Sequence, residues 1–199
     1  MQEIKLFGKW SNSGIKVNDP GLKSYISLKT VLVPETGARD ASERFYKSKR
    51  NIVERLIGKV MVPGHKSKKH KYSSGHVTGK KQQAMKIVED AFQIIENKMK
   101  KNPVEVFVKA LENAAPRDEV TSIEYGGARY PQAVDCAPQR RIDQAIKQMV
   151  QGSFGKSFNN KRKIQECLAD EIMKASELSQ ESNAISKKLE AERQADSSR

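Results

Sequence analysis

The 199-residue sequence predicts a mainly α-helical protein with a projecting two-stranded β-ribbon and an extended N-terminal arm. Apolar residues recur at intervals of three and four in six segments beyond residue 47, the period of helices that bury one face. Residues 118–136 instead alternate around two glycines, as a hairpin does. We therefore expect an arm at residues 1–47 and a six-helix domain at residues 48–199, with the ribbon at about residues 118–136, between the third and fourth helices.

The N-terminal segment shows no helical period, and we expect it to be ordered mainly by whatever it touches. Asn18–Gly21 and Val33–Gly37 combine Pro and Gly in patterns typical of turns. The stretch between them, Tyr25–Val33, is a candidate strand.

The first helix is expected to begin near Ser48, a suitable N-cap, and to end at about Met61, because Pro63 follows. A polar and basic loop comes next. A loop of this length is uncommon in a compact domain and is usually functional or disordered. The second helix is expected to begin at Thr78 or Gly79.

The third helix has the clearest start signal, because Asn102 suits an N-cap and Pro103 suits the first turn. Pro116 ends this helix. Pro138 in turn fits the first turn of the fourth helix, and the sequence GSFGKSFNN at residues 152–160 is expected to break the chain again.

The last two helices are shorter. The fifth has an apolar stripe that runs from Ile164 to Ala175. The sixth begins near Ser182 and has Ile185 and Leu189 as its main apolar anchors.

The charge is concentrated in one part of the chain. The whole sequence carries +13, and residues 44–81 contain twelve Lys or Arg against the single acid Glu54, a net +11. A solvated surface usually mixes both signs, so a segment with one acid has no internal partner for its charge. The pattern indicates phosphate binding, with nucleic acid as the first candidate.

The sequence also indicates in which cellular compartment the protein is found. No apolar run approaches the roughly 20 residues that span a bilayer, and the first ten residues lack the pattern of a signal peptide. Cys136 and Cys167 both lie on apolar faces, which predicts buried thiols in a reducing cytoplasm.

The hairpin is expected to turn at Gly126–Gly127, because a two-residue turn of the mirror-image type needs positive φ at both positions. Pro131 is tolerated because both strands of a ribbon are edges. A lone ribbon is marginal in water, so two interpretations are open: it folds flat on the helices, or it projects toward nucleic acid. The predicted cross-strand pairs are Tyr125–Ala128, Glu124–Arg129 and Ile123–Tyr130.

The chain resembles the universal small-subunit ribosomal protein number seven family. Four segments in the family's order carry the resemblance: Ser48–Leu56, NPVEVFVKALENAAPR (102–117), YGGARYPQAVDCAPQRR (125–141) and KIQECLADEI (163–172). The stretches LFGKW and VNDPGLKSYISLK, with the basic loop before the second helix, are similar to the archaeal and eukaryotic branch. The resemblance covers nearly the whole chain.

The resemblance implies a six-helix domain with a ribbon between the third and fourth helices. It also implies a structural constituent of the small ribosomal subunit, not an enzyme, that binds rRNA directly and nucleates assembly of the head. The ribbon and the C-terminal region would lie at the subunit interface, near the exit-site tRNA and the mRNA path. The protein would be cytoplasmic, beside other head and platform proteins in the ribosome, monomeric off it, and without a membrane partner.

The candidate rRNA-binding residues are basic. Lys49, Arg50, Arg140 and Arg141 match family motifs, whereas the loop at 66–71 is a prediction from charge alone. The full set is Lys47, Lys49, Arg50, Lys59, Lys66, Lys68, Lys69, Lys71, Lys80, Lys81, Arg117, Arg140, Arg141, Lys147 and Lys156.

The tip of the ribbon is the second candidate site. Arg129 supplies a charge there and Tyr130 a face for stacking, a combination that RNA-binding surfaces favour. The tip residues expected to point toward tRNA and mRNA are Tyr125, Gly126, Gly127, Arg129 and Tyr130.

Two other classes of function are weighed against this. An architectural DNA-binding protein can also pair a helical body with basic β-arms. Such a protein would prefer duplex DNA to structured RNA and would be a dimer, whereas the predicted rRNA-binding protein would be a monomer.

The sequence supports an enzyme less well than it supports a nucleic-acid-binding protein. The stretch GHVTGK (75–80) is one residue short of a phosphate-binding loop and lacks its following Ser or Thr. His65, His70 and His76 do not have helical metal-ligand spacing. We expect no catalytic residue, metal or cofactor.

Overall fold

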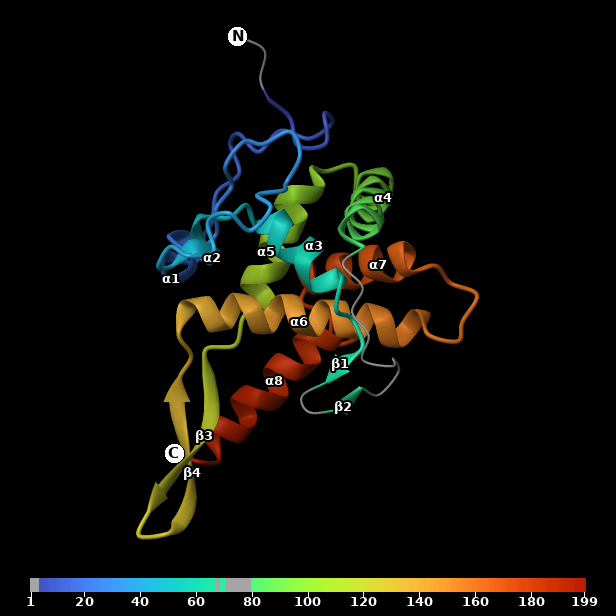
Figure 1. Cartoon of the computed structure of the whole chain (residues 1–199). Coiled ribbons are helices and arrows are strands. Elements are labelled where there is room, and N and C mark those ends of the chain that lie inside the picture. Colours follow the sequence, from blue (N-terminus) through green and yellow to red (C-terminus); the bar gives the residue numbers. More distant parts are fainter. Residues whose placement is uncertain (1–3, 67–68, 71–79) are drawn as a thin grey trace.

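The computed structural model describes residues 4–66, 69–70 and 80–199, and within these ranges the chain is mainly helical (Figure 1). Six longer helices match the six that the periodicity predicts, and two one-turn helices precede them. The helices are α1 (Pro20–Lys23), α2 (Tyr46–Lys49), α3 (Ile52–Val60), α4 (Lys81–Met99), α5 (Pro103–Ala114), α6 (Pro138–Ser157), α7 (Ile164–Ser176) and α8 (Asn183–Asp196). Among the helices described, none combines the length and the apolarity needed to span a membrane.

The core lies where α7 packs against α4, α5 and α6. Phe92 of α4 and Phe107 of α5 are fully buried, with ring centroids 6.0 Å apart. The start of α5 is as predicted: the Asn102 side chain accepts a hydrogen bond from the Val104 N–H, and Pro103 occupies the first turn. A side-chain cap of this kind contributes about 1 kcal/mol.

Ser48 is not the cap of the first long helix, and this prediction is wrong. Ser48 belongs to α2, and the chain then changes direction at Arg50 before α3 begins. Asn51 caps α3 instead, because its side chain accepts from the Val53 N–H at 2.8 Å. The predicted start of the second helix, Thr78 or Gly79, lies outside the described residues, and α4 is helical from Lys81.

The break predicted at residues 152–160 is also wrong in its first half, because α6 continues to Ser157. Gly152 is a packing residue and not a helix breaker. A Cβ atom added there would lie 2.6 Å from the Cβ of Asn183, so the glycine allows α8 to start against α6. Asn183 also donates to the Gln148 carbonyl of α6 at 2.8 Å.

The predicted sixth helix is α8, and Ser182 caps it as expected. Ile185 is buried, but Leu189 is 44% exposed and does not anchor the helix. The buried positions of α8 are Ala184, Ile185 and Ala195, so small residues take the place of the expected leucine.

The N-terminal segment contributes to the same core. Leu6, Trp10 and Leu22 are buried, and the Trp10 ring contacts Phe92 edge-on at a centroid distance of 5.7 Å. The strand predicted at Tyr25–Val33 does not form. Its backbone groups bond to the start of α3 instead, since the Ser27 carbonyl accepts from Ile52 N at 3.0 Å.

Two antiparallel hairpins occur in the described residues. The short one joins β1 (His65–Lys66) to β2 (Lys69–His70). The long one is the predicted ribbon, β3 (Asp118–Tyr125) with β4 (Ala128–Asp135), and its register is confirmed at all three predicted pairs. Gly126 and Gly127 have φ of 58° and 82°, as the turn requires. Figure 1 shows the ribbon reaching away from the helices, with α8 along its base.

A candidate nucleic-acid interface between α3 and α6

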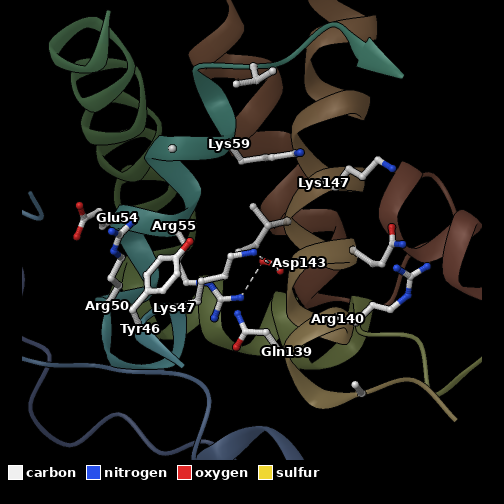
Figure 2. Close-up of a pocket in the computed structure, with 15 residues that line it drawn as sticks. Tyr46, Lys47, Arg50, Glu54, Arg55, Lys59, Gln139, Arg140, Asp143 and Lys147 are labelled. Atoms are coloured by element: carbon white, nitrogen blue, oxygen red, sulfur yellow. Dashed lines mark hydrogen bonds and ion pairs between the residues drawn. The ribbon is translucent and has the colours of Figure 1, made fainter. Parts of the chain in front are cut away.

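An open pocket of about 680 Å³ lies between the α2–α3 segment and α6 (Figure 2). Six cationic side chains line it against two acids, Glu54 and Asp143. Such an excess in a concave surface concentrates positive potential and attracts anions. The cations are Lys47, Arg50, Arg55, Lys59, Arg140 and Lys147.

Asp143 of α6 lies near the middle of the pocket and is bonded to two of these cations (Figure 2). Arg55 Nη2 donates to Asp143 Oδ1 at 3.0 Å, and Lys47 Nζ contacts Oδ2 at 3.2 Å. The Arg55 side chain is only 6% exposed, and its Nη1 also donates to the Tyr25 carbonyl. Burial lowers the pKa of Arg55, and the bond to Asp143 opposes that effect. Asp143 thus ties α3 to α6.

Lys59 and Lys147 have no comparable acid. Neither forms an ion pair with another described residue, although both line the pocket. Burial lowers the pKa of Lys59, and the positive charge of Lys147 lowers it further. Two cations from two helices therefore face the same space without a counter-charge of their own.

The rim near α2 is more fully paired. Arg50 donates to both carboxylate oxygens of Asp40, at distances between 2.6 and 3.0 Å, and its guanidinium lies 4.7 Å from the Tyr46 ring centroid. These hydrogen bonds hold the pKa of Asp40 below its usual range. Lys49 pairs with Glu43 at 2.6 Å, but both side chains are more than half exposed, so an incoming phosphate can replace that partner.

Arg140 and Arg141 open α6 together but have different surroundings. Arg140 is 53% exposed and pairs with Glu119 at 2.5 Å. Arg141 is 11% exposed, donates to Asp19 at 2.8 Å and to the Pro116 carbonyl at 3.0 Å, and so joins the N-terminal segment to the end of α5. Arg140 lines the pocket, whereas Arg141 is held inside the fold.

The remaining predicted cations lie elsewhere. Lys156 pairs with the fully buried Glu171 at the far end of α6, and Lys81 pairs with Glu54 and Glu35. Arg117 is exposed at the base of the ribbon, and Lys80 is exposed just before α4. The pocket therefore gathers Lys47, Arg50, Lys59, Arg140 and Lys147 from the predicted set and leaves these four outside.

Four of the predicted rRNA-binding lysines lie wholly or partly outside the described residues. Lys68 and Lys71 lie outside the described residues, and only the backbones of Lys66 and Lys69 are described. The same limits apply to the histidines and to most of the stretch GHVTGK.

The ribbon tip carries the other predicted site. Tyr125 is 81% exposed and Tyr130 is 59% exposed. Arg129 pairs across the ribbon with Glu124 at 3.3 Å, and both side chains are mostly in solvent. The tip therefore presents two aromatic rings and one weakly paired cation.

Arg55 and Asp143 are the pocket residues that the sequence-based list misses. Arg55 lies four residues before Lys59 on α3, off the centre of the apolar stripe, and this spacing is a signal that both face the same side. No sequence signal pairs Asp143 with Arg55, because the two are 88 positions apart.

Comparison with known proteins gives a consistent result. A family model described as "Ribosomal protein S7p/S5e" matches residues 22–199. The chain is 54% identical over 197 residues to the small ribosomal subunit protein uS7 of Nanoarchaeum equitans, which covers 99% of this chain and 100% of that protein. It is 48% identical to uS7 of Methanococcus maripaludis, with the same coverage, and 47% identical to uS7 of Methanothermobacter thermautotrophicus over 94% of this chain and 95% of that protein.

Proposed function

The chain belongs to the ribosomal protein S7p/S5e family, and we propose from this premise that the pocket between α3 and α6 is its principal rRNA-binding surface. Family membership makes the chain a structural protein of the small ribosomal subunit that binds rRNA, and hence a cytoplasmic protein of the ribosome. The family is structural rather than enzymatic. The alternative of an architectural DNA-binding protein finds no support in the matches.

The observation that carries the proposal is the clustering of six cations, from the α2–α3 segment and from α6, around one open pocket that has only two acids. Phosphate contacts supply most of the affinity of such surfaces, and their number sets the salt dependence. Arg140 and Lys147 lie two turns apart on α6, so they can contact separate phosphates of one strand. The lysines of the basic loop between α3 and α4 would add positive charge to the same RNA-binding surface.

We further propose that the bound RNA is the part of the small-subunit rRNA that forms the head, whose assembly this protein would nucleate. The ribbon tip would lie near the exit-site tRNA and the mRNA path, with other head and platform proteins as neighbours. The support is the family resemblance together with the exposure of Tyr125 and Tyr130. Their rings are free to stack on unpaired bases.

The test is a salt titration of binding between the full chain and a transcript of the head domain of small-subunit rRNA. The variant Lys47→Gln with Arg140→Gln should lower the slope of log affinity against log salt by about 1.4 to 1.8, since each lost phosphate contact accounts for roughly 0.7–0.9. The control, Lys86→Gln with Lys109→Gln, removes two exposed cations on α4 and α5 that lie outside the pocket.

Equal slopes for the two double variants would refute the pocket as the principal surface. A parent slope near zero would refute phosphate-driven binding altogether.

A further inference from the structure

Lys59 is a cation of the pocket that forms no ion pair with another described residue. It is half-buried on α3 and extends toward Lys147 of α6 (Figure 2). Among the charged groups around it, Lys47 and Lys147 repel its positive charge and Asp143 attracts it. Asp143, however, is already bonded to Arg55 and Lys47. A cation that loses water contact without gaining a partner costs stability.

Three buried polar atoms of the pocket lining have no hydrogen-bond partner among the described residues: a donor on α3, a donor on α6 and the acceptor Glu54 Oε2. Arg55 Nε and Gln139 Nε2 are buried, and neither has an acceptor within the described part of the chain. Both residues line the pocket. Buried donors of this kind usually have partners, and the oxygens of an anion would supply acceptors on this side of the molecule.

We propose that Lys59 and Lys147 together hold a single phosphate group of the bound RNA, which bridges α3 to α6. This rests on the proposed function and specifies one point of it. A phosphate has enough acceptor oxygens to accept from both ammonium groups, and its charge offsets their repulsion.

The arrangement predicts a cost in the free protein and a gain on binding. Without an anion, the two lysines oppose the packing of α3 on α6. With one, the same pair links the two helices, as Arg55 and Asp143 do deeper in the pocket. The free protein should therefore tolerate loss of Lys59 well, and the complex should not.

The experiment uses the full chain with ¹³C-labelled lysine side chains, observed by NMR during titration with inorganic phosphate and, at equal ionic strength, with chloride. The Lys59 and Lys147 signals should follow one saturable curve in phosphate but not in chloride, and the pKa of Lys59 should rise toward or above its ordinary value. In Lys59→Met the response of Lys147 should be lost. Lys86, exposed on α4, reports the non-specific effect of salt.

Two results would overturn the shared site: responses of Lys59 and Lys147 no larger than that of Lys86, or a Lys147 response that survives in Lys59→Met. The melting temperature of the phosphate-free Lys59→Met variant adds a second measurement. It should equal or exceed that of the parent, whereas a lower value would mean that Lys59 stabilises the fold and is not an anion ligand.

These outcomes are separable from failure of the proposed function. If the head-domain transcript binds with the expected salt slope but phosphate does not couple the two lysines, only the shared phosphate is refuted. If the transcript does not depend on Lys47 and Arg140, the pocket itself is refuted as the RNA surface.

Discussion

The basic pocket and the ribbon tip both present cations to solvent, but they are built in opposite ways. In the pocket, Arg55 is 6% exposed and is held between α3 and α6 by Asp143. At the tip, Arg129 is 76% exposed and its carboxylate partner on the neighbouring strand is 60% exposed. Helix packing therefore fixes the positions of the charges in the pocket. The tip has no core of its own, and a lone two-stranded ribbon is only marginally ordered in water.

Arg140 and Arg141 show the same contrast at the point where the two regions meet. They are adjacent in sequence, yet Arg140 lines the pocket and Arg141 joins the N-terminal segment to the end of α5. Burial acts to raise the pKa of Asp19, but the hydrogen bonds from Arg141 and the Gly21 N–H, with the positive charges of Arg141 and Arg117, together keep that pKa below its ordinary value. Of these two adjacent arginines, Arg140 therefore lies at the surface and Arg141 makes contacts inside the fold.

The largest expected effect separates these two roles. Arg141→Ala should lower the free energy of unfolding by about 3 kcal/mol, because it leaves Asp19 and the Pro116 carbonyl without their partner in a mostly buried setting. Arg140→Ala should change it by less than about 0.5 kcal/mol, as is usual for an exposed pair, while weakening binding to rRNA. Denaturant unfolding and filter binding measure the two quantities. Equal losses of stability would show that the two arginines do not differ in role.

A smaller effect tests whether the base of the ribbon belongs to the helical body. Cys136 follows β4 and is buried; burial, followed by the negative charge of Glu119, raises its pKa from 9.0 to about 11. The folded thiol keeps its proton to higher pH than the unfolded one. The stability that it contributes is thus present below about pH 9 and lost as pH rises through 11, by about 2 to 3 kcal/mol in total.

The measurement is the difference in unfolding free energy between the parent and Cys136→Ala from pH 8 to pH 11, since other titrating groups cancel in it. The parent should lose its advantage as pH rises. A difference that does not vary with pH would mean that the thiol is open to solvent and that the ribbon base is loosely attached.

The smallest expected effect on stability comes from the ribbon tip. Replacing residues 122–131 with Asn-Gly keeps the Thr121–Gln132 pair in register, and the Gln132 N–H can close the two-residue turn, which Pro131 could not. The free energy of unfolding should change by less than about 1 kcal/mol, because the removed side chains are exposed. Incorporation of the variant into small subunits, followed by a translation assay, should instead show impaired function. Collapse of the cooperative melt would show that the tip packs on the helices and would break the comparison.

Local patterns predicted the elements that depend on neighbouring residues. Asn102 and Pro103 correctly predict the start of α5. Two adjacent glycines predict the turn of the ribbon and therefore the register of its strands. The errors arise where a distant contact decides. Gly152 has the sequence character of a helix breaker, but it allows Asn183 of α8 to pack against α6. Leu189 is predicted to anchor α8, but the buried positions of that helix are Ala184, Ile185 and Ala195. Tyr25–Val33 reads as a strand, but α3 takes the hydrogen bonds that a strand would have used.

The amino-acid sequence by itself determined the helical class, the ribbon and its register, and the concentration of charge in residues 44–81. The helical class and the ribbon follow from secondary-structure propensity and hydrophobic periodicity, which depend on neighbouring residues. The charge concentration follows from composition, which is a sum over residues of the chain. Only the tertiary structure decided which cations share a surface. Arg55 and Asp143 are 88 positions apart, and Arg140 and Arg141 are neighbours with different partners. Packing sets such distances, and no local pattern records them.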